Sequence, residues 1–509
     1  MGLLRGFMTV GLWTMLSRVL GFVRDILIAA YLGAGPVAEA FLVAFSLPNM
    51  FRRFFAEGAF NMAFVPMFSK KLENGEDPKG FARDALSGLG FILLIFSALA
   101  IVAMPWLVLA MASGFAQDAR FDLAVVFGRI AFPYILFISL AALLSGVLNA
   151  NRRFVAAAAA PVLLNFGFIA ALALATWRGW DIGLTLAWTV PLAGIAQLGF
   201  VWLAAARAGF RLIPRWPRLT PELKRLAIIA APAALAGGVV QVNLLVGRQV
   251  ASFFDGAIAW LNYADRLYQL PLGVVGIAVG VVLLPDLSRR LQAGDTAGGQ
   301  QALSRAAEFS LALTLPAAVA LCVIPNALVS VLFQRGAFGV DDAASTALAV
   351  AVYGLGLPAF VMQKVLQPLY FAREDTTRPF YFALAAMVVN AGLAIGLAPM
   401  IGFIAAAIAT TLAGWVMLAL LWWFSRGYGE AGRFDGAFSR RWPRILLASV
   451  AMGALLWAVQ IPLGPFLATP GLRYGALAVL VTLGGVSYFG FAHLFGAIRL
   501  SDLRGAMRR

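Results

Sequence analysis

Hydrophobic residues run through the chain in stretches of about 20 residues, which is the length of a helix that crosses a bilayer core of about 30 Å. The stretches recur from the first residues to the last, and turn residues or charges separate them. They predict an all-α polytopic membrane protein with fourteen transmembrane helices, at about 8–32, 37–68, 82–111, 122–149, 155–176, 183–206, 224–251, 257–285, 304–325, 344–370, 380–399, 402–424, 443–461 and 473–497.

Polar residues interrupt the first two stretches on one helical face each. In the first stretch they fall within an arc of roughly 120°, and the arc holds Thr14, Ser17, Arg18, Gly21, Arg24, Asp25 and Ile28. In the second they step by threes and fours, at Ser46, Asn49, Arg53, Glu57 and Asn61. A charge at the bilayer centre costs about 2.5–3.5 kcal/mol, so such residues face a protein interior or a cavity. We expect both stripes to line a cationic cavity.

A matching face occurs in the stretch 257–285, where AWLNYADRLYQLP places Asn262, Asp265, Arg266 and Gln269 at helical spacing. We therefore expect arginines from both halves of the chain to converge on one central site. The stretches contain eight cations, namely Arg18, Arg24, Arg52, Arg53, Arg129, Arg248, Arg266 and Lys364, against four anions that we assign to them, namely Asp25, Glu39, Glu57 and Asp265.

The surplus of positive charge predicts an anionic ligand, because buried charges are otherwise paired. Seven of the eight cations are Arg, whose planar guanidinium binds phosphate through two hydrogen bonds. An anionic substrate is the favoured interpretation for Arg18, Arg24, Arg52 and Arg266. Internal pairing or snorkelling is favoured for Arg53, Arg129, Arg248 and Lys364.

Composition agrees with a membrane protein and sets its orientation. The chain is 62% hydrophobic and 12% charged, with a mean hydropathy of +0.88 and a net charge of +16. Of its 39 Lys and Arg residues, 27 fall in one set of loops and tails and 4 in the opposite loops, which are Arg120, Arg178, Arg335 and Arg473. The bias places both termini in the cytoplasm and explains the positive charge without nucleic acid. One Cys and one His exclude a His/Cys metal cluster, so we expect no metal and no cofactor.

A repeat divides the chain. VPMFSKKL at 65–72 matches LPDLSRRL at 284–291, which predicts two parallel six-helix repeats followed by two additional helices. The predicted parts are an N-lobe at 1–206, a basic cytoplasmic linker at 207–223, a C-lobe at 224–424, and the last two helices with a cytoplasmic tail at 425–509.

The segments SRVLGFVRD, AFLVAFSLPNMFRRFFAEGAFNMAFVPMF and NYADRLYQLPLGVVGIAVGVVLLPDLS resemble the MurJ (MviN) lipid II flippases. These belong to the multidrug/oligosaccharidyl-lipid/polysaccharide exporter superfamily. The resemblance implies two lobes that rock between inward-open and outward-open states, and a groove for the polyprenyl tail on the last two helices. It also implies functional roles for Ser17, Arg18, Arg24, Arg52, Glu57 and Arg266, with Glu39 where many relatives have Asp.

The expected function is therefore transport rather than catalysis. The substrate is lipid II, the undecaprenyl-diphosphate-linked disaccharide-pentapeptide, which moves across the bacterial cytoplasmic (inner) membrane for peptidoglycan synthesis. We expect Ser17, Arg18, Arg24, Arg52 and Arg266 to bind substrate, and the cavity or its gates to contain Asp25, Glu39, Arg53, Glu57, Asn262 and Asp265. Coupling to the membrane potential or to an ion gradient stays open, as does association with cell-wall synthesis proteins.

Three other functions are weighed against this one. An exporter of another polyprenyl-linked polysaccharide fits the same features and is the first alternative. A multidrug antiporter for cationic drugs needs an acidic cavity, and the predicted cavity is basic. A membrane enzyme acting on polyprenyl phosphates would be expected to show a His or an Asp-rich metal site, and the chain has one His and no such cluster.

Overall fold

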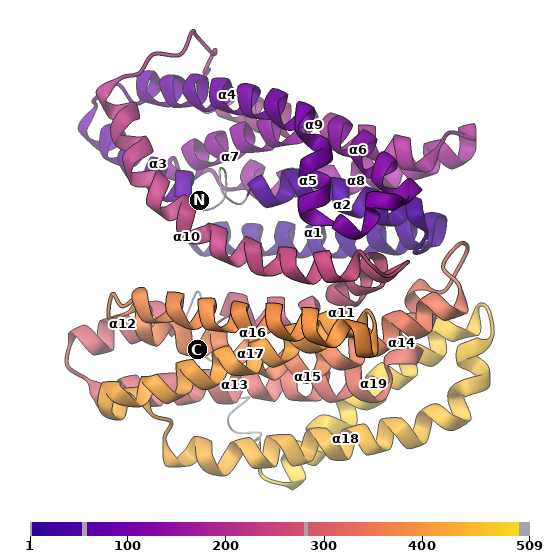
Figure 1. The fold of residues 1–509 in the computed structure, drawn as a ribbon. Helices are drawn as coiled ribbons and strands as arrows, with labels where there is room; N and C mark the ends of the chain where they lie inside the picture. Colours follow the sequence, from indigo (N-terminus) through magenta and orange to yellow (C-terminus); the bar gives the residue numbers. More distant parts are fainter. Residues whose placement is uncertain (1–2, 53–58, 279–282, 498–509) are drawn as a thin grey trace. The chain divides into compact units, whose positions relative to one another are not determined.

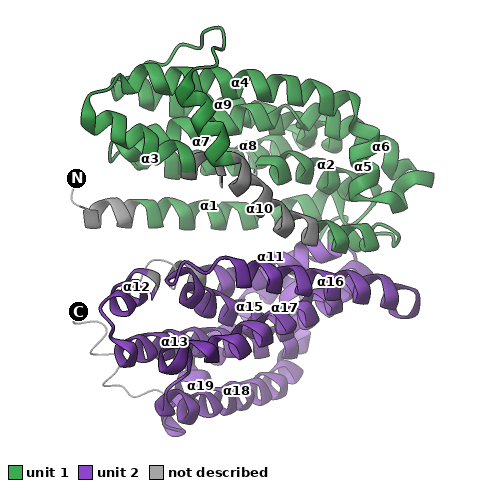
Figure 2. Ribbon diagram, turned by 60° about the vertical axis from the view of Figure 1, so that its left-hand side comes forward, with its two compact units in different colours: residues 1–259, 335–338 green, residues 260–334, 339–509 purple. Residues whose placement is uncertain are grey.

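The computed structural model describes residues 3–52, 59–278 and 283–497, and every regular element in those ranges is helical. The helices form two compact units (Figure 2). Unit 1 comprises residues 1–259 and 335–338, and unit 2 comprises residues 260–334 and 339–509. The segment 335–338 therefore packs with unit 1 although its neighbours in sequence belong to unit 2.

The helices of unit 1 follow one another along the chain, and a long segment, residues 208–220, connects α9 to α10 (Figure 1). They are α1 (Leu3–Leu32), α2 (Pro36–Arg52), α3 (Ala59–Asn74), α4 (Pro78–Val102), α5 (Met104–Met111), the 3-10 turn η2 (Ser113–Gln117), α6 (Ala119–Ala131), α7 (Tyr134–Ala150), α8 (Val155–Arg178), α9 (Ile182–Arg207) and α10 (Pro221–Ala251). Helix α11 (Ala257–Ala278) begins in unit 1 and continues in unit 2.

Unit 2 contains the rest of α11 and eight further α-helices (Figure 1). They are α12 (Leu284–Gln292), α13 (Thr296–Val323), α14 (Pro325–Phe333), α15 (Val340–Phe371), α16 (Thr377–Ile401), α17 (Ile404–Ser425), α18 (Gly436–Ala468) and α19 (Leu472–Leu494), with the 3-10 segment η4 (Arg426–Gly432) between α17 and α18. Both copies of the repeat motif lie in helices, the first in α3 and the second in α12.

Local sequence explains where many of the helices start. Side-chain oxygens accept hydrogen bonds from first-turn amides that have no partner inside the helix. The caps of α4, α9, α10, α13 and α18 are Asp77, Asp181, Thr220, Asp295 and Asp435. Proline in the first turn adds to this at α4, α5, α10, α12 and α14.

Breaks divide two of the predicted spans. The stretch 82–111 consists of α4 and α5, which meet at Ala103 just before Pro105, and the stretch 122–149 consists of α6 and α7, which meet at Pro133. A proline lacks the N–H that the continuing helix would need, so each break follows from sequence.

Ten helical segments in the described part are long and apolar enough to cross a membrane. Each of the fourteen predicted stretches overlaps a described helix, but the count of fourteen crossings stays a prediction. Large apolar side chains are exposed along many of these helices, among them Leu94 and Leu99 on α4 and Ile395 and Met400 on α16. Exposed apolar side chains along long helices are what lipid-facing surfaces require.

Candidate functional site

Arg24 of α1 is buried in a polar cluster inside unit 1. Its Nε and Nη2 donate to Asp25 Oδ1 at 3.0 and 2.8 Å, and its Nη1 donates to Asn165 Oδ1 on α8 at 2.9 Å. The Asn165 amide in turn donates to the Ser17 carbonyl oxygen at 2.9 Å and to Ser17 Oγ at 3.3 Å. Asn165 therefore joins two predicted substrate-binding residues, Ser17 and Arg24, through one side chain.

Aromatic rings complete the surroundings of this guanidinium. Its Cζ lies 5.4 Å from the ring centroid of Phe168 and 5.9 Å from that of Phe45, and the two rings meet edge to face. The faces of both rings attract a cation, and they exclude water from the ion pair. Helix α8 reaches α1 at Gly21, where an added Cβ would lie 3.5 Å from the Asn165 amide nitrogen.

The other predicted residues of the first stretch and the second differ in accessibility. Arg18 is exposed on α1, and Arg52 is half-buried at the end of α2. Ser46 and Asn49 donate to carbonyl oxygens of the preceding turn of α2, at 2.6 and 2.8 Å. Two further predicted positions, Arg53 and Glu57, lie outside the described residues.

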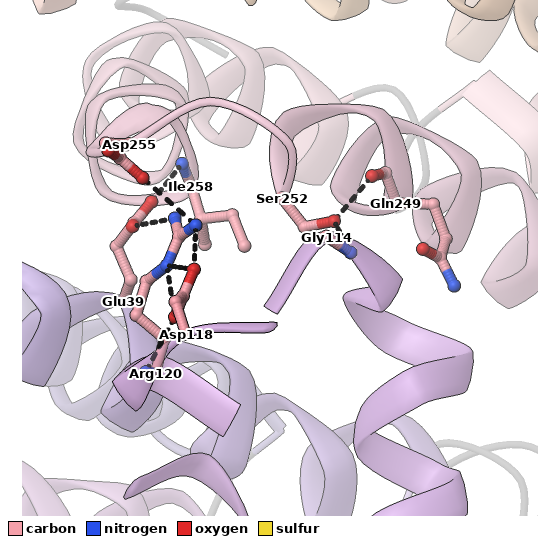
Figure 3. Close-up of polar contacts among 8 residues, drawn as sticks. All are labelled: Glu39, Gly114, Asp118, Arg120, Gln249, Ser252, Asp255 and Ile258. Atoms are coloured by element: carbon pink, nitrogen blue, oxygen red, sulfur yellow. Dashed lines mark hydrogen bonds and ion pairs between the residues drawn. The ribbon is translucent and has the colours of Figure 1, made fainter. Parts of the chain in front are cut away.

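Glu39 of α2 is the centre of a second buried network (Figure 3). Its side chain is 1% exposed, and Oε2 accepts from Arg120 Nη1 at 2.8 Å while Oε1 accepts from the backbone N–H of Ile258 at 3.0 Å. Ile258 is in the first turn of α11, so this carboxylate also occupies a helix N-terminus, where the backbone dipoles favour a negative charge. Glu39 was predicted from the sequence, but its partners were not.

Arg120 binds three carboxylates at once. Besides Glu39 it contacts Asp118 at 2.5–3.0 Å and Asp255 at 3.0 Å, and its guanidinium lies 4.4 Å from the ring centroid of Phe115. The Arg120 guanidinium holds the pKa of the Asp118 carboxyl below its ordinary value. The sequence placed Arg120 in a loop between predicted spans, whereas the residue is in the first turn of α6 and only 5% exposed.

A neighbouring set of hydrogen bonds joins η2 to the end of α10 (Figure 3). The Gln249 side-chain oxygen accepts from the N–H and the hydroxyl of Ser113, at 2.9 and 2.8 Å, and Ser252 Oγ accepts from the N–H of Gly114 at 2.9 Å. A Cβ at Gly114 would overlap the Ser252 backbone, so glycine is required for this approach. These contacts link residues of the predicted N-lobe with residues of the predicted C-lobe.

Backbone atoms make a third contact of this kind. The N–H of Ala337 donates to the Ala30 carbonyl oxygen at 2.8 Å. Glycines flank it on both chains: Gly33 has φ +61° and Gly336 has φ +57°, and a Cβ on either would overlap the facing backbone. We call the part of unit 1 formed by residues 30–39, 113–120, 249–258 and 335–338 the Glu39 end.

The predicted residues of the second half lie on α11 in unit 2. Asn262, Asp265 and Arg266 are half-buried, and Gln269 donates to Asp265. Next to them the rings of Tyr268 and Tyr353 lie 5.1 Å apart. Arg24 belongs to unit 1 and Arg266 to unit 2, and the convergence of the two on one central site stays a prediction.

Two corrections concern the charges of the predicted spans. The count of four anions is wrong, because Asp84 and Glu308 are also buried inside them. Both lie close to the start of a predicted span and pair with arginines, Asp84 with Arg215 and Glu308 with Arg305 and Arg441. Their partners Arg215, Arg305 and Arg441 are not among the eight counted cations, so these two anions do not neutralise that set. Among the described residues, no group of three or more His, Cys, Asp or Glu side chains could hold a metal ion.

Comparisons with known proteins agree on one family. The family model described as lipid II flippase MurJ matches residues 28–470. A curated relative from Rhizobium meliloti (strain 1021), named probable lipid II flippase MurJ, is 45% identical over 519 residues, covering 100% of this chain and 97% of the relative.

Solved structures show the same fold. A structure titled lipid II flippase MurJ, inward closed conformation, has a TM-score of 0.80 at 26% identity, covering 96% of this chain and 98% of that chain. An inward-facing multidrug resistance MATE family transporter of the MOP superfamily has a TM-score of 0.68 at 15% identity, covering 82% of this chain and 95% of that chain, which shows the fold alone. The chain belongs to the lipid II flippase MurJ family.

Proposed function

We propose that this protein moves lipid II from the cytoplasmic to the outer leaflet of the bacterial cytoplasmic membrane, for peptidoglycan synthesis. The family match over residues 28–470 and the relative at 45% identity support this substrate. The protein is a transporter and not an enzyme. The transported lipid keeps its covalent structure, so the protein must supply a polar path for the headgroup and a barrier that opens on one side at a time.

The diphosphate of the substrate binds arginines from both halves of the chain. The proposed substrate-binding residues are Ser17, Arg18, Arg24, Arg52 and Arg266. Arg24 supports this assignment because its guanidinium is already held by Asp25 and Asn165, whose oxygens a phosphate can replace at similar distances. Asp25, Glu39, Arg53, Glu57, Asn262 and Asp265 act in the cavity or in its gates.

The Glu39 end is the gate on the outer side. This assignment follows from the distribution of Lys and Arg, which are concentrated in the other set of loops and tails. That bias places the basic loops and both termini in the cytoplasm. Fourteen transmembrane helices in two parallel six-helix repeats, with two helices added, complete the proposed topology.

The observation that most strongly supports alternating access at this gate concerns Glu39. The Glu39 carboxylate of α2 binds Arg120 and the first turn of α11 together, so one side chain joins the predicted N-lobe to the predicted C-lobe. These bonds, the Gln249 and Ser252 contacts and the Ala30–Ala337 bond are all short polar interactions. Such contacts form and break as a set when two rigid parts rock.

In this proposal, transport is driven by the membrane potential or by an ion gradient. A diphosphate headgroup carries negative charge, and moving one elementary charge through the membrane potential is worth about 2.3 kcal/mol per 100 mV. Movement from a negative interior to the outside is then favourable. Dissipating the potential in vesicles should slow transport if this coupling is correct.

Depletion in cells tests the substrate. The gene should replace the essential flippase of a host, and its depletion should lower the lipid II that an externally added cleaving enzyme reaches while total lipid II rises. Unchanged accessibility would contradict the proposal. Accumulation of a different polyprenyl-linked saccharide would favour the alternative, an exporter of another polysaccharide precursor.

A further inference from the structure

The segment between α9 and α10, residues 208–220, has no regular secondary structure, and one side of it is held against the helices of unit 1. Phe210 and Leu212 are buried, and they alternate with the exposed Arg211 and Ile213. The Leu212 carbonyl oxygen accepts from Trp202 Nε1 at 3.0 Å. This part of the segment therefore has one side held by the helices and one side exposed.

Arg215 fixes the same segment to α4. Its backbone N–H donates to Ser87 Oγ at 2.9 Å and its Nε donates to Asp84 Oδ1 at 2.5 Å. One residue later, the Trp216 ring lies 6.1 Å from the ring of Phe91. The segment therefore runs along the first turns of a candidate membrane span, which begins at Pro78.

The outer face of the segment combines large apolar side chains with cations. Ile213, Trp216 and Leu219 are 61%, 81% and 82% exposed. The cations around them are exposed too, and they are Arg207, Arg211, Arg218, Lys224 and Arg225. Arg215 is compensated by Asp84, and Glu222 lies 3.7 Å from Lys71, so the net charge of this face is positive. We call Arg207, Arg211, Ile213, Trp216, Arg218, Leu219, Lys224 and Arg225 the linker face.

The surface next to the linker face indicates what covers it. Past Phe91, helix α4 exposes Ile92, Leu94, Ile95 and Leu99, and it is long and apolar enough to cross a membrane. Trp216 thus extends a surface that only lipid chains can cover in a membrane protein, and the cations lie beside it. An indole at the edge of the hydrocarbon, with Arg and Lys nearby, is typical of the interface of an anionic leaflet. An acidic protein would match the charge but not this continuity.

We propose that the linker face binds the anionic phospholipid headgroups of the cytoplasmic leaflet, with Trp216 and Leu219 inserted at the edge of the hydrocarbon. Because Arg215 and Leu212 attach the segment to α4 and α9, lipid binding anchors unit 1 where the chain passes from the predicted N-lobe to the predicted C-lobe. The inference rests on the proposed orientation of the flippase. Lipid contact is measured without lipid II, so its failure and a failure of transport are distinguishable.

A fluorescent label on the linker face tests the proposal. The protein has one cysteine, so Leu219→Cys in a Cys322→Ser background gives a single labelling site for a bimane. The full-length protein is reconstituted in phosphatidylcholine vesicles with and without phosphatidylglycerol, and brominated acyl chains serve as the quencher. We expect severalfold stronger quenching when phosphatidylglycerol is present, and loss of that difference after Arg211→Gln, Arg218→Gln, Lys224→Gln and Arg225→Gln are combined.

Two controls keep the result decisive. Arg178→Gln removes an exposed cation at the end of α8, away from the linker face, and should leave the quenching unchanged. Raising the salt concentration with the cations intact should weaken the quenching, which needs no variant that could misfold. Quenching that depends neither on phosphatidylglycerol nor on salt would overturn the proposal. So would the finding that an acidic protein, rather than the lipid, covers the label.

Discussion

Glu39 and Ile258 are 219 positions apart, and the carboxylate of the first accepts the backbone N–H of the second at 3.0 Å. The other carboxylate oxygen accepts from Arg120 at 2.8 Å. One side chain thus satisfies a first-turn amide of α11 and pairs with a buried arginine. An amide or a shorter apolar side chain could serve at most one of these partners.

Replacing Glu39 therefore distinguishes the two bonds. Glu39→Gln keeps an acceptor for Ile258 but removes the negative charge opposite Arg120, whereas Glu39→Ala removes both. A hydrogen bond to a charged group is worth roughly 1.5–3 kcal/mol. We therefore expect the Glu39 end to open more often in the Glu39→Gln variant and most often in the Glu39→Ala variant. The rate at which Ala34→Cys, in a Cys322→Ser background, reacts with an impermeant thiol reagent measures this opening.

Asp255 supplies the matched control for Glu39. It also contacts Arg120, at 3.0 Å, but its side chain is 95% exposed. Exposed ion pairs contribute little to stability. The Ala34→Cys probe should therefore react at nearly the same rate with and without Asp255→Asn. If Asp255→Asn and Glu39→Ala accelerate labelling equally, burial of the Glu39 pair is not what holds this end closed.

Asn165 should be as necessary for transport as the predicted residues that it joins. Asn165→Leu removes the acceptor for Arg24 and the donor to Ser17, and it leaves Asp25 as the remaining hydrogen-bond partner of Arg24 among the described residues. We expect transport to fall at least tenfold while the protein still inserts, because the guanidinium loses its orientation. Asn149→Leu, on α7, is the control, since Asn149 is exposed and takes no part in the described hydrogen bonds that join Ser17, Arg24 and Asn165. Normal transport by Asn165→Leu would mean that Arg24 needs no positioning from α8.

The sequence predicted the helices well because apolar length alone determines where a chain can cross a bilayer. It also predicted that Asp25 and Glu39 lie inside the protein, since a charge in an apolar stretch has few other places to go. Asn165 could have been found by the same reasoning, as a lone amide in the apolar run of α8.

Pairing could not be predicted in the same way. Arg120 lies close to Asp118 and Asp122 in a sequence that looks like a polar loop. Only the fold shows that Arg120 is buried and paired with Glu39. Asp84 and Glu308 were missed because each lies close to the start of a predicted span and within three residues of an arginine, where an exposed position was equally consistent with the sequence. Partners far apart in the chain are set by packing, which periodicity does not report.

The orientation can be tested directly with fusion reporters. Reporters at residues 75, 215 and 432 should report the cytoplasm, and reporters at 117 and 337 should report the outer side, because Lys and Arg concentrate in the first set of loops. Opposite signals at both 75 and 117 would reverse the membrane orientation, and with it the assignment of the Glu39 end to the outer side.

Lysine substitutions test whether the arginines bind a phosphate. Arg18→Ala, Arg24→Ala, Arg52→Ala and Arg266→Ala should each abolish transport in protein that still inserts at normal levels. The corresponding Lys variants should recover only part of it, because an ammonium cannot make two parallel hydrogen bonds to one phosphate. Lys variants with full activity would show that charge alone is sufficient, and full activity of the Ala variants would make these arginines structural.

Gly336 tests the backbone contact at the Glu39 end. Its φ of +57° disfavours any other residue, and an added Cβ would overlap the Ala30 carbonyl oxygen, which is backbone and cannot rotate away. Gly336→Ala should therefore break the bond between Ala337 and Ala30, and the Ala34→Cys probe should react faster. Transport should fall, since the outer gate would no longer close fully.

A substitution at Gly294 distinguishes the cost of a left-handed backbone from the cost of a steric overlap. Gly294 has a φ of +72°, but no atom lies within 4 Å of the position of its Cβ. Gly294→Ala thus bears only the cost of the left-handed backbone, roughly 1–2 kcal/mol, whereas Gly336→Ala adds the overlap with α1. We expect Gly294→Ala to leave probe reactivity and transport near normal. Equal effects of the two variants would assign the loss to backbone strain alone, and an unreactive probe in Gly336→Ala would show that the Ala30–Ala337 contact does not seal this end.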